Sequence, residues 1–391
     1  MKKDLDKLVD YHVAGAGKGV AYRRTADFVD RYGHRFTGTE NLERSIDHLE
    51  SIVRQDGFND VHFESVSVPR WVRGEERCVL LSPLVGNATK KLPMLGLGFS
   101  VGTGMEGITS DVVVVNSFED LAMKSDKVRG KIVLFNFPWT KYGECTPYRY
   151  LGASFAAKYG AVAVLIRSLA SFSLSTPHTG SMGYIKVEKI PSAAITAEDA
   201  AMLQRMQERG DKVVVQLHMS AQTLSNTPSR NTIVEIKGSK YPDEVVIVSG
   251  HIDSWDVGQG AIDDAGPSFV AYQVVKAVKD LGLKPKRTLR MIFWTAEEVG
   301  VVGGRQYYED HKGEADKISM VIELDYSIFT ATGASLRSDA PTLLVMRAVG
   351  ESLARIGGSH VFADAGFTTS DMGRFVESHQ IPALTVAQVP K

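Results

Sequence analysis

The chain has 391 residues, of which 43% are hydrophobic and 23% charged, and its formal net charge is −1. This composition is typical of a globular protein with a large core and more than one domain, and it excludes a disordered or collagen-like chain. A net charge near zero provides no overall field to attract nucleic acid or an anionic membrane surface. The longest apolar runs, such as residues 161–166, are far shorter than the roughly 20 residues that cross a bilayer. We therefore expect no nucleic-acid partner and no membrane span.

Targeting and cysteine chemistry leave few signals in this sequence. Residues 1–6 carry the charges of a signal peptide's start, but no apolar stretch follows them, so we expect no signal peptide in the sequence as given. Cys78 and Cys145 are too few for a disulfide scaffold or a thiolate zinc site, and whether they pair with each other is left open. We expect any metal ion to be held by His, Asp and Glu.

In the first half of the chain, the pattern of predicted secondary structure changes once, from helices to short β-rich runs. Apolar spacing predicts helices over residues 22–32 and 40–55, the second capped by Thr39, and a strand over residues 60–68 follows. From about residue 69 to residue 221 the sequence consists of short β-rich runs separated by Gly, Pro and Ser. The clearest of these runs are residues 111–116, 130–135, 161–166, 190–196 and 212–217. We expect a small β-rich module here.

After a polar stretch at residues 224–230, predicted strands alternate with predicted helices. The strands are expected over residues 244–250, 288–295 and 318–325, and the helices near residues 269–281 and 304–312. Such alternation indicates a mostly parallel sheet with right-handed crossovers. The helices at the N-terminus are too few to bury a core alone, so we expect them to pack on this sheet. The expected domains are residues 1–68 with 222–391, interrupted by an insertion of residues 69–221.

Acids and a histidine follow the ends of the three predicted strands. They are His251, Asp253, Asp263 and Asp264 after the first strand, Glu297 and Glu298 after the second, and Asp325 at the end of the third. In open α/β sheets, ligands bind beyond these carboxyl ends. Taken singly, each pattern has an ordinary alternative, such as a helix N-cap or a hydrogen-bonded core histidine. Gathered in one crevice, however, the carboxylates would repel one another without a cation. Imidazole and carboxylate ligands without thiolate suit Zn²⁺, with Mn²⁺ or Co²⁺ as substitutes.

These stretches carry a family resemblance. Residues 251–264, residues 294–298 and Asp325 resemble the co-catalytic zinc aminopeptidase and carboxypeptidase family, and residues 128–133 and 190–195 are similar to a protease-associated domain. The resemblance covers nearly the whole chain. It implies an α/β catalytic domain with a mostly parallel central sheet and an inserted β-rich protease-associated domain. It further implies hydrolysis of dipeptides or short peptides with free termini, a secreted or lysosomal location and a homodimer.

The resemblance also implies roles for individual residues. It implies two zinc ions whose ligands are His251 and Asp325 on one ion, Glu298 on the other, and Asp263 bridging both. Asp253 would orient His251, and Glu297 would be the general base. Two zinc ions about 3.5–4 Å apart can hold a bridging hydroxide. A carboxylate that is not a ligand is needed to accept the proton of the water, and either member of the Glu297–Glu298 pair satisfies this requirement on chemistry alone.

One departure from the family concerns the last zinc ligand. The family places a histidine beyond the strand that corresponds to residues 381–386, whereas this sequence ends at Lys391 without one. His360 and His379 are the nearby substitutes, and both precede the strand. We therefore expect the Glu298 site to lack one protein ligand. The alternative function is a non-catalytic binding or receptor-like module that retains the peptidase fold with an incomplete metal site.

Overall fold

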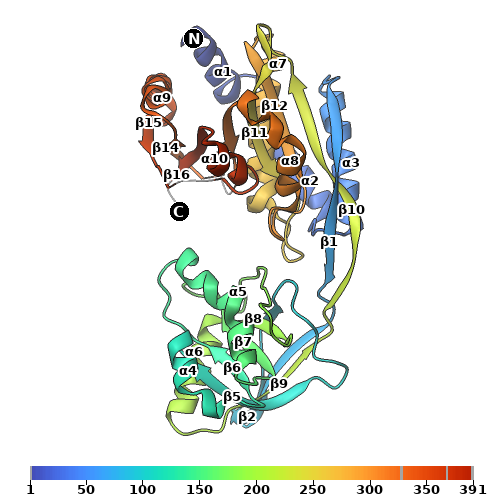
Figure 1. Ribbon diagram of the computed structural model, residues 1–391, viewed down its shortest axis with the longest axis vertical. Helices are drawn as coiled ribbons and strands as arrows, with labels where there is room; N and C mark the ends of the chain where they lie inside the picture. Colours follow the sequence, from blue (N-terminus) through green and yellow to red (C-terminus); the bar gives the residue numbers. More distant parts are fainter. Residues whose placement is uncertain (1, 326–328, 367–368, 389–391) are drawn as a thin grey trace. The chain divides into compact units, whose positions relative to one another are not determined.

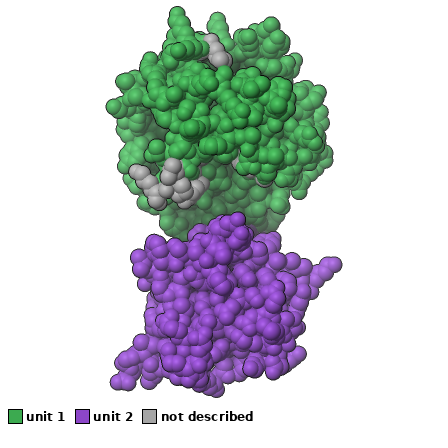
Figure 2. Space-filling model, turned by 90° about the vertical axis from the view of Figure 1, so that its left-hand side faces the viewer, with its two compact units in different colours: residues 1–69, 226–391 green, residues 70–225 purple. Residues whose placement is uncertain are grey.

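The computed structural model describes residues 2–325, 329–366 and 369–388, and the chain divides into two compact units. Unit 1 comprises residues 1–69 and 226–391, and unit 2 comprises residues 70–225 (Figure 2). Figure 1 labels most of the helices and strands of both units. Among the described residues, no helix is both long and apolar enough to cross a membrane.

Unit 1 is built around a mixed sheet with helices. Its helices are α1 (Lys2–Val13), α2 (Val20–Tyr32), α3 (Glu40–Gln55), α7 (Gly266–Asp280), α8 (Val302–His311), α9 (Ala340–Ser352) and α10 (Gly373–His379), with short helical turns η2 (Ala261–Ala265), η3 (Lys312–Lys317) and η4 (Ala354–Ile356). Its strands are β11 (Tyr241–His251), β12 (Arg287–Trp294), β13 (Ile318–Glu323), β14 (Ala331–Arg337), β15 (His360–Ala363) and β16 (Ala383–Gln388), together with β1 (Val61–Val72) and β10 (Gln222–Ile236), in which the unit boundaries fall.

The strand order in this sheet is β1-β10-β12-β11-β13-β16-β14-β15. The four central strands, β12, β11, β13 and β16, are parallel, whereas β10 and β14 run antiparallel to their central neighbours. This confirms the expected mostly parallel sheet. The register pairs His251 with Trp294, so the segments that follow β11 and β12 leave the sheet at the same edge.

Side chains of alternate residues fill separate cores on the two faces of the sheet. On β12, Phe293 belongs to a core with Phe28 of α2, Leu49 of α3 and Phe269 of α7. Its neighbour Trp294 belongs to a second core with residues of α8 and α10. The N-terminal helices therefore pack on the C-terminal sheet, as the sequence predicts. The expected helix cap is also present, because Thr39 Oγ1 accepts a hydrogen bond from the backbone amide of Leu42.

The polar stretch at residues 224–230 lies inside strand β10, a strand that was not expected from the sequence, and the division between the two units falls within it. Residues 222–226 are all exposed, so this part of the strand shows no alternation of apolar and polar residues. Strand β10 is recognised as a strand because it is hydrogen-bonded to the neighbouring strand β1.

Unit 2 contains a second eight-stranded sheet in the order β3-β2-β9-β5-β6-β7-β8-β4. Its strands are β2 (Glu76–Val85), β3 (Ala88–Leu92), β4 (Met94–Gly96), β5 (Ile108–Val115), β6 (Ile132–Phe135), β7 (Ala163–Arg167), β8 (Ser192–Ile195) and β9 (Val214–Met219). Its helices are α4 (Phe118–Met123), α5 (Tyr142–Lys158) and α6 (Ala197–Glu208), with a short turn η1 (Ser125–Lys127). Strands β5 to β8 are parallel.

The helices of unit 2 were not expected from the sequence. Leu203 of α6 packs in one core of this unit, and Ala153 of α5 packs in the other. Helix α5 buries mostly small residues and contains Pro147, so it lacks the spaced large apolar residues that indicate an amphipathic helix. Cys78 and Cys145 lie in these different cores and are both free thiols, which settles the question of pairing.

Candidate metal centre

The candidate site surrounds His251, the last residue of β11. Its imidazole is buried, and Nε2 lies 3.1 Å from Oδ1 of Asp263, 3.9 Å from Oε2 of Glu297 and 3.9 Å from Oδ1 of Asp325. The other ring nitrogen, Nδ1, lies 3.1 Å from the backbone oxygen of Asp253. One edge of the parallel sheet thus delivers a histidine and several carboxylates to a common point.

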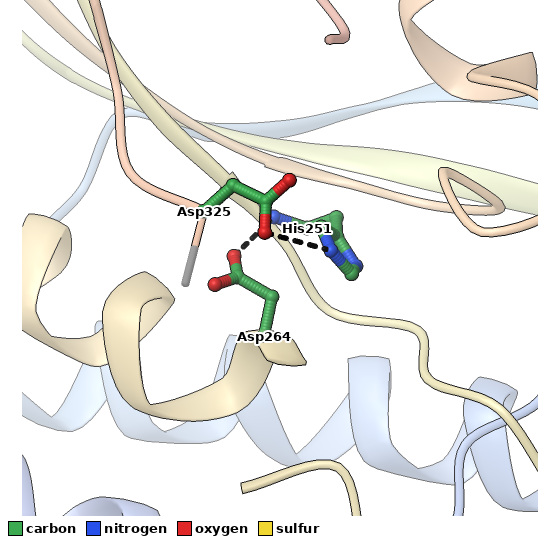
Figure 3. A group of neighbouring side chains, drawn as sticks. All are labelled: His251, Asp264 and Asp325. Carbon is green, nitrogen blue, oxygen red and sulfur yellow. Dashed lines mark hydrogen bonds and ion pairs between the residues drawn. The ribbon is translucent and has the colours of Figure 1, made fainter. Parts of the chain in front are cut away.

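Two groups of side chains place potential ligand atoms within 4.8 Å of one another. The first consists of His251, Asp264 and Asp325, which point toward one another in Figure 3. The second consists of His251, Asp263 and Glu298. All four ligands expected from the sequence therefore belong to these groups. The difference is that Asp264, and not Asp263, accompanies His251 and Asp325.

Asp264 had no separate role among the ligands expected from the sequence. Its carboxylate is fully buried, and Oδ2 accepts hydrogen bonds from the backbone amide of His251 at 2.9 Å and from Oγ of Ser268 at 3.2 Å. These bonds fix the start of α7 against the end of β11. The Asp263–Asp264 peptide bond is cis. In the sequence, the only indication that Asp264 belongs to the site was its position next to Asp263.

Asp253 holds the loop that carries the two glutamates. It is fully buried, and its carboxylate oxygens accept hydrogen bonds from the backbone amides of Glu297 at 3.0 Å and Glu298 at 3.3 Å. The contact of this carboxylate with His251 is longer, at 3.5 Å between Oδ1 and Nδ1. Its shortest side-chain contacts are therefore with the glutamate loop.

Burial and mutual repulsion change the pKa values of five groups in the cluster. Burial, reinforced by nearby acids, raises the pKa of Glu297 to about 7 and that of Asp325 to about 6. The pKa values of Asp264 and Glu298 also lie well above their usual range for the same reason. Burial lowers the pKa of His251, but the surrounding carboxylates outweigh burial and hold it well above its usual range. A bound cation would remove this repulsion.

The donor set fits a zinc-type metal ion. Oδ1 of Asp264 is buried and has no hydrogen-bond partner among the described residues, which is costly unless a ligand satisfies it. Imidazole and carboxylates are ordinary ligands of zinc.

His360 and His379, the possible substitutes for a missing ligand, lie elsewhere. His360 is in strand β15 and His379 ends helix α10, and both side chains are exposed. Within residues 2–325, 329–366 and 369–388, neither histidine joins the two ligand groups.

Two residues near the site, Glu323 and Arg35, were not expected from the sequence. The carboxylate of Glu323, at the end of β13, accepts hydrogen bonds from the backbone amides of Ser370, Asp371 and Met372 and from the Ser370 hydroxyl. Asp371 is itself buried, and burial raises its pKa well above the usual range. Glu323 could have been noticed, since it lies two residues before Asp325. Arg35, described below, gave no signal, because a single arginine in a loop is usually exposed.

Comparisons with known proteins identify the family of this chain. The sequence profile of Peptidase family M28 matches residues 231–391, and that of the PA domain matches residues 108–203. Carboxypeptidase Q from Mus musculus is 46% identical over 91% of this chain and 75% of that protein, and the Homo sapiens protein is 48% identical over 88% and 72%.

Solved structures share the fold. A Peptidase M28 precursor from Shewanella amazonensis SB2B superposes with a TM-score of 0.89 at 28% identity, covering 99% of this chain and 87% of that one. A zinc aminopeptidase from Bacillus subtilis superposes with a TM-score of 0.71 at 21% identity, covering 95% and 86%. The chain therefore belongs to the carboxypeptidase Q group of peptidase family M28, with an inserted PA domain, and is a metallo-exopeptidase.

Proposed function

We propose that this metallo-exopeptidase hydrolyses dipeptides or short peptides with free termini and that its metal is zinc. The observation that carries the proposal is the position of His251 Nε2, a buried nitrogen that faces the carboxylates of Asp263, Glu297 and Asp325 at the carboxyl edge of the sheet. The names of the relatives, carboxypeptidase Q and zinc aminopeptidase, support the same reaction class and metal.

The proposed metal ligands are the four residues expected from the sequence. His251 and Asp325 hold one zinc ion, Glu298 holds a second, and Asp263 lies between them. Asp264 is an additional candidate at the first ion, because it shares a group with His251 and Asp325. Bound zinc would supply Lewis-acid polarisation of the scissile carbonyl and activation of the attacking water.

Glu297 is the proposed general base. It lies near His251 but does not belong to either ligand group, so its carboxylate remains available for proton transfer. A carboxylate in this position accepts the proton of the attacking water and returns it to the leaving amine. Asp253 assists by holding the backbone amide of Glu297. A module that only binds peptides needs no such device, which argues against the non-catalytic alternative.

Other parts of the proposal rest on the family resemblance. We propose a homodimer, a secreted or lysosomal location, and domain boundaries at residues 68/69 and 221/222. The division of the chain after residues 69 and 225 supports these boundaries. Light scattering after size-exclusion chromatography tests the dimer, and folding of residues 69–221 expressed alone tests the boundaries.

The reaction is tested with purified protein that has been stripped of metal and reloaded with zinc. The substrates are a dipeptide, the same dipeptide with an acetylated amino terminus, and the same dipeptide with an amidated carboxyl terminus. We expect zinc-dependent cleavage of the unblocked dipeptide and loss of cleavage when the recognised terminus is blocked. Zinc-loaded protein that binds the dipeptide without cleaving it would favour the non-catalytic alternative.

A further inference from the structure

Arg35 is a fully buried arginine at the metal centre. It lies in the segment between helices α2 and α3, far from the metal-ligand candidates in sequence. Its guanidinium reaches the loop of residues 252–260, which leads from the end of β11 to the turn η2. That loop separates two proposed zinc ligands, His251 and Asp263.

The guanidinium holds both ends of this loop. Nε donates a hydrogen bond to the backbone oxygen of Ile252 at 2.7 Å, directly after His251. Nη1 donates to the backbone oxygen of Gln259, and Nη2 to that of Gly260, both at 2.8 Å. One planar group thus joins the residue after the first ligand to the residues that precede η2. A further bond from Nη1 to the backbone oxygen of Gly33, at 2.8 Å, fixes the guanidinium to its own segment.

The backbone of Arg35 adds two more connections to the loop. Its amide donates to Oγ of Ser254 at 3.0 Å, and its carbonyl oxygen accepts from the backbone amide of Ser254 at 3.2 Å. Gly260 permits this close packing, since a Cβ atom there would lie 2.3 Å from Cβ of Ser254 and 2.8 Å from Nη2 of Arg35. Gly260 also has a φ of +58°, which favours glycine.

The charge of Arg35 suits its surroundings. Although burial lowers its pKa to about 10, four acids of the site, Asp253, Asp264, Asp263 and Glu298, act in the opposite direction. The guanidinium therefore stays protonated at neutral pH beside the carboxylates, and its hydrogen bonds go to backbone oxygens rather than to the ligand oxygens. It can orient the loop without occupying the positions that a metal ion needs.

We propose that Arg35 is a positioning residue of the metal centre, which fixes the loop of residues 252–260 so that Asp263 is held opposite His251 before metal binds. This inference rests on the proposed ligand roles of His251 and Asp263. It depends on the planar, forked geometry of the guanidinium. A lysine keeps the charge but presents one ammonium group, which cannot reach the three loop carbonyls together.

The test compares Arg35→Lys and Arg35→Met with the control Arg24→Met. Arg24 also lies in unit 1, where its guanidinium pairs with Asp56 at 2.6 Å, away from the loop. Hydrogen exchange of residues 252–260 is measured in the metal-free proteins, and zinc affinity is measured by chelator competition. Both Arg35 variants should exchange faster in this loop and bind zinc about 10–100-fold more weakly, the usual cost of losing a residue that supports metal ligands. The control should lose thermal stability but keep loop protection and zinc affinity.

Several results would overturn this inference. Arg35→Lys with wild-type loop protection and zinc affinity would show that charge alone suffices. Failure of both Arg35 variants to fold, beside a folded control, would assign Arg35 to global stability. The proposed function has its own test, and it is contradicted if the wild-type protein binds no zinc or cleaves no dipeptide. The exchange measurement on metal-free protein then still reports whether Arg35 orders the loop.

Discussion

The carboxylate of Asp253 accepts a hydrogen bond from the backbone amide of Glu297 at 3.0 Å, with the neighbouring amide of Glu298 bound to its second oxygen. Nδ1 of His251 lies closer to the backbone oxygen of Asp253 than to its carboxylate. We infer that the side chain of Asp253 positions the proposed general base and that its backbone oxygen is the main partner of the histidine ring, with the carboxylate 3.5 Å from Nδ1. The family resemblance alone suggested that the side chain orients His251.

Replacement of Asp253 by Asn tests this division of roles. An amide group offers one acceptor oxygen, so one of the two backbone amides would lose its partner. We expect kcat to fall about 10–100-fold, while zinc content stays close to that of the wild type because the backbone oxygen that faces His251 remains. Steady-state kinetics and elemental analysis measure the two quantities, with the exposed Asp316→Asn as control. If Asp253→Asn lost zinc while kcat per bound zinc stayed unchanged, this division of roles would be contradicted.

The two adjacent glutamates should respond differently to the same substitution. Glu297→Gln keeps the shape of the side chain but removes its basicity, so kcat should fall by roughly 10²- to 10⁴-fold with little loss of zinc. Glu298→Gln should instead lose zinc from the second site. Activity and zinc per chain, measured on both variants, separate the roles. The reverse pattern would mean that the roles are exchanged.

The stability of the metal-free protein should fall as pH rises. Glu297 and Asp325, with pKa values of about 7 and 6, bind protons more tightly in the folded chain than in the unfolded chain. The same holds for His251, whose pKa is also raised. Carboxyl groups of the unfolded chain titrate near pH 4, so between about pH 4 and pH 7 the folded chain binds more protons than the unfolded chain. Raising the pH in this range therefore lowers the free energy of unfolding.

We expect the melting temperature of the metal-free protein to be several degrees lower at pH 8 than at pH 5, since ~1 kcal/mol corresponds to about 2–4 °C in a domain of 150–250 residues. Bound zinc should reduce or reverse this dependence of the melting temperature on pH, because it neutralises the negative charge of the carboxylates. Glu297→Gln should make the dependence weaker, because it removes one of the groups that titrate. Thermal unfolding in matched buffers measures the effect. A metal-free protein that becomes more stable toward pH 8 would contradict the pKa shifts.

Glu323 should contribute mainly to stability. Its carboxylate accepts three backbone amides and a hydroxyl from residues 370–372. Glu323→Gln replaces one acceptor oxygen with a donor, and the free energy of unfolding should fall by about 1–3 kcal/mol. Denaturant titration measures this loss, with the exposed Glu377→Gln of α10 as control. Equal stability of the two variants would show that the loop has other anchors.

Much of the site was predictable because sheet geometry converts sequence position into spatial position. Residues that follow parallel strands meet at one edge, so His251, Glu297 and Asp325 could be expected to lie together. The helix capped by Thr39 was also predictable, because its signals are local.

Features that depend on distant contacts were not predictable. Strand β10 shows no apolar alternation over residues 222–226 and is defined by its neighbouring strand. The burial of Arg35 depends on carbonyl groups more than 200 positions away in the sequence. The choice between Asp263 and Asp264 as partner of Asp325 depends on the local backbone path, which a pair of identical residues does not reveal.

Anomalous diffraction at the zinc edge from crystals of the zinc-loaded protein tests the central claim most directly. We predict a zinc ion about 2.0–2.2 Å from Nε2 of His251 and from a carboxylate oxygen of Asp325, and a second ion at the same distance from Glu298, with Asp263 between them. Glu297 should remain uncoordinated. Zinc bound elsewhere, with Nε2 of His251 beyond ligand distance, would contradict the assignment of this cluster as the catalytic centre.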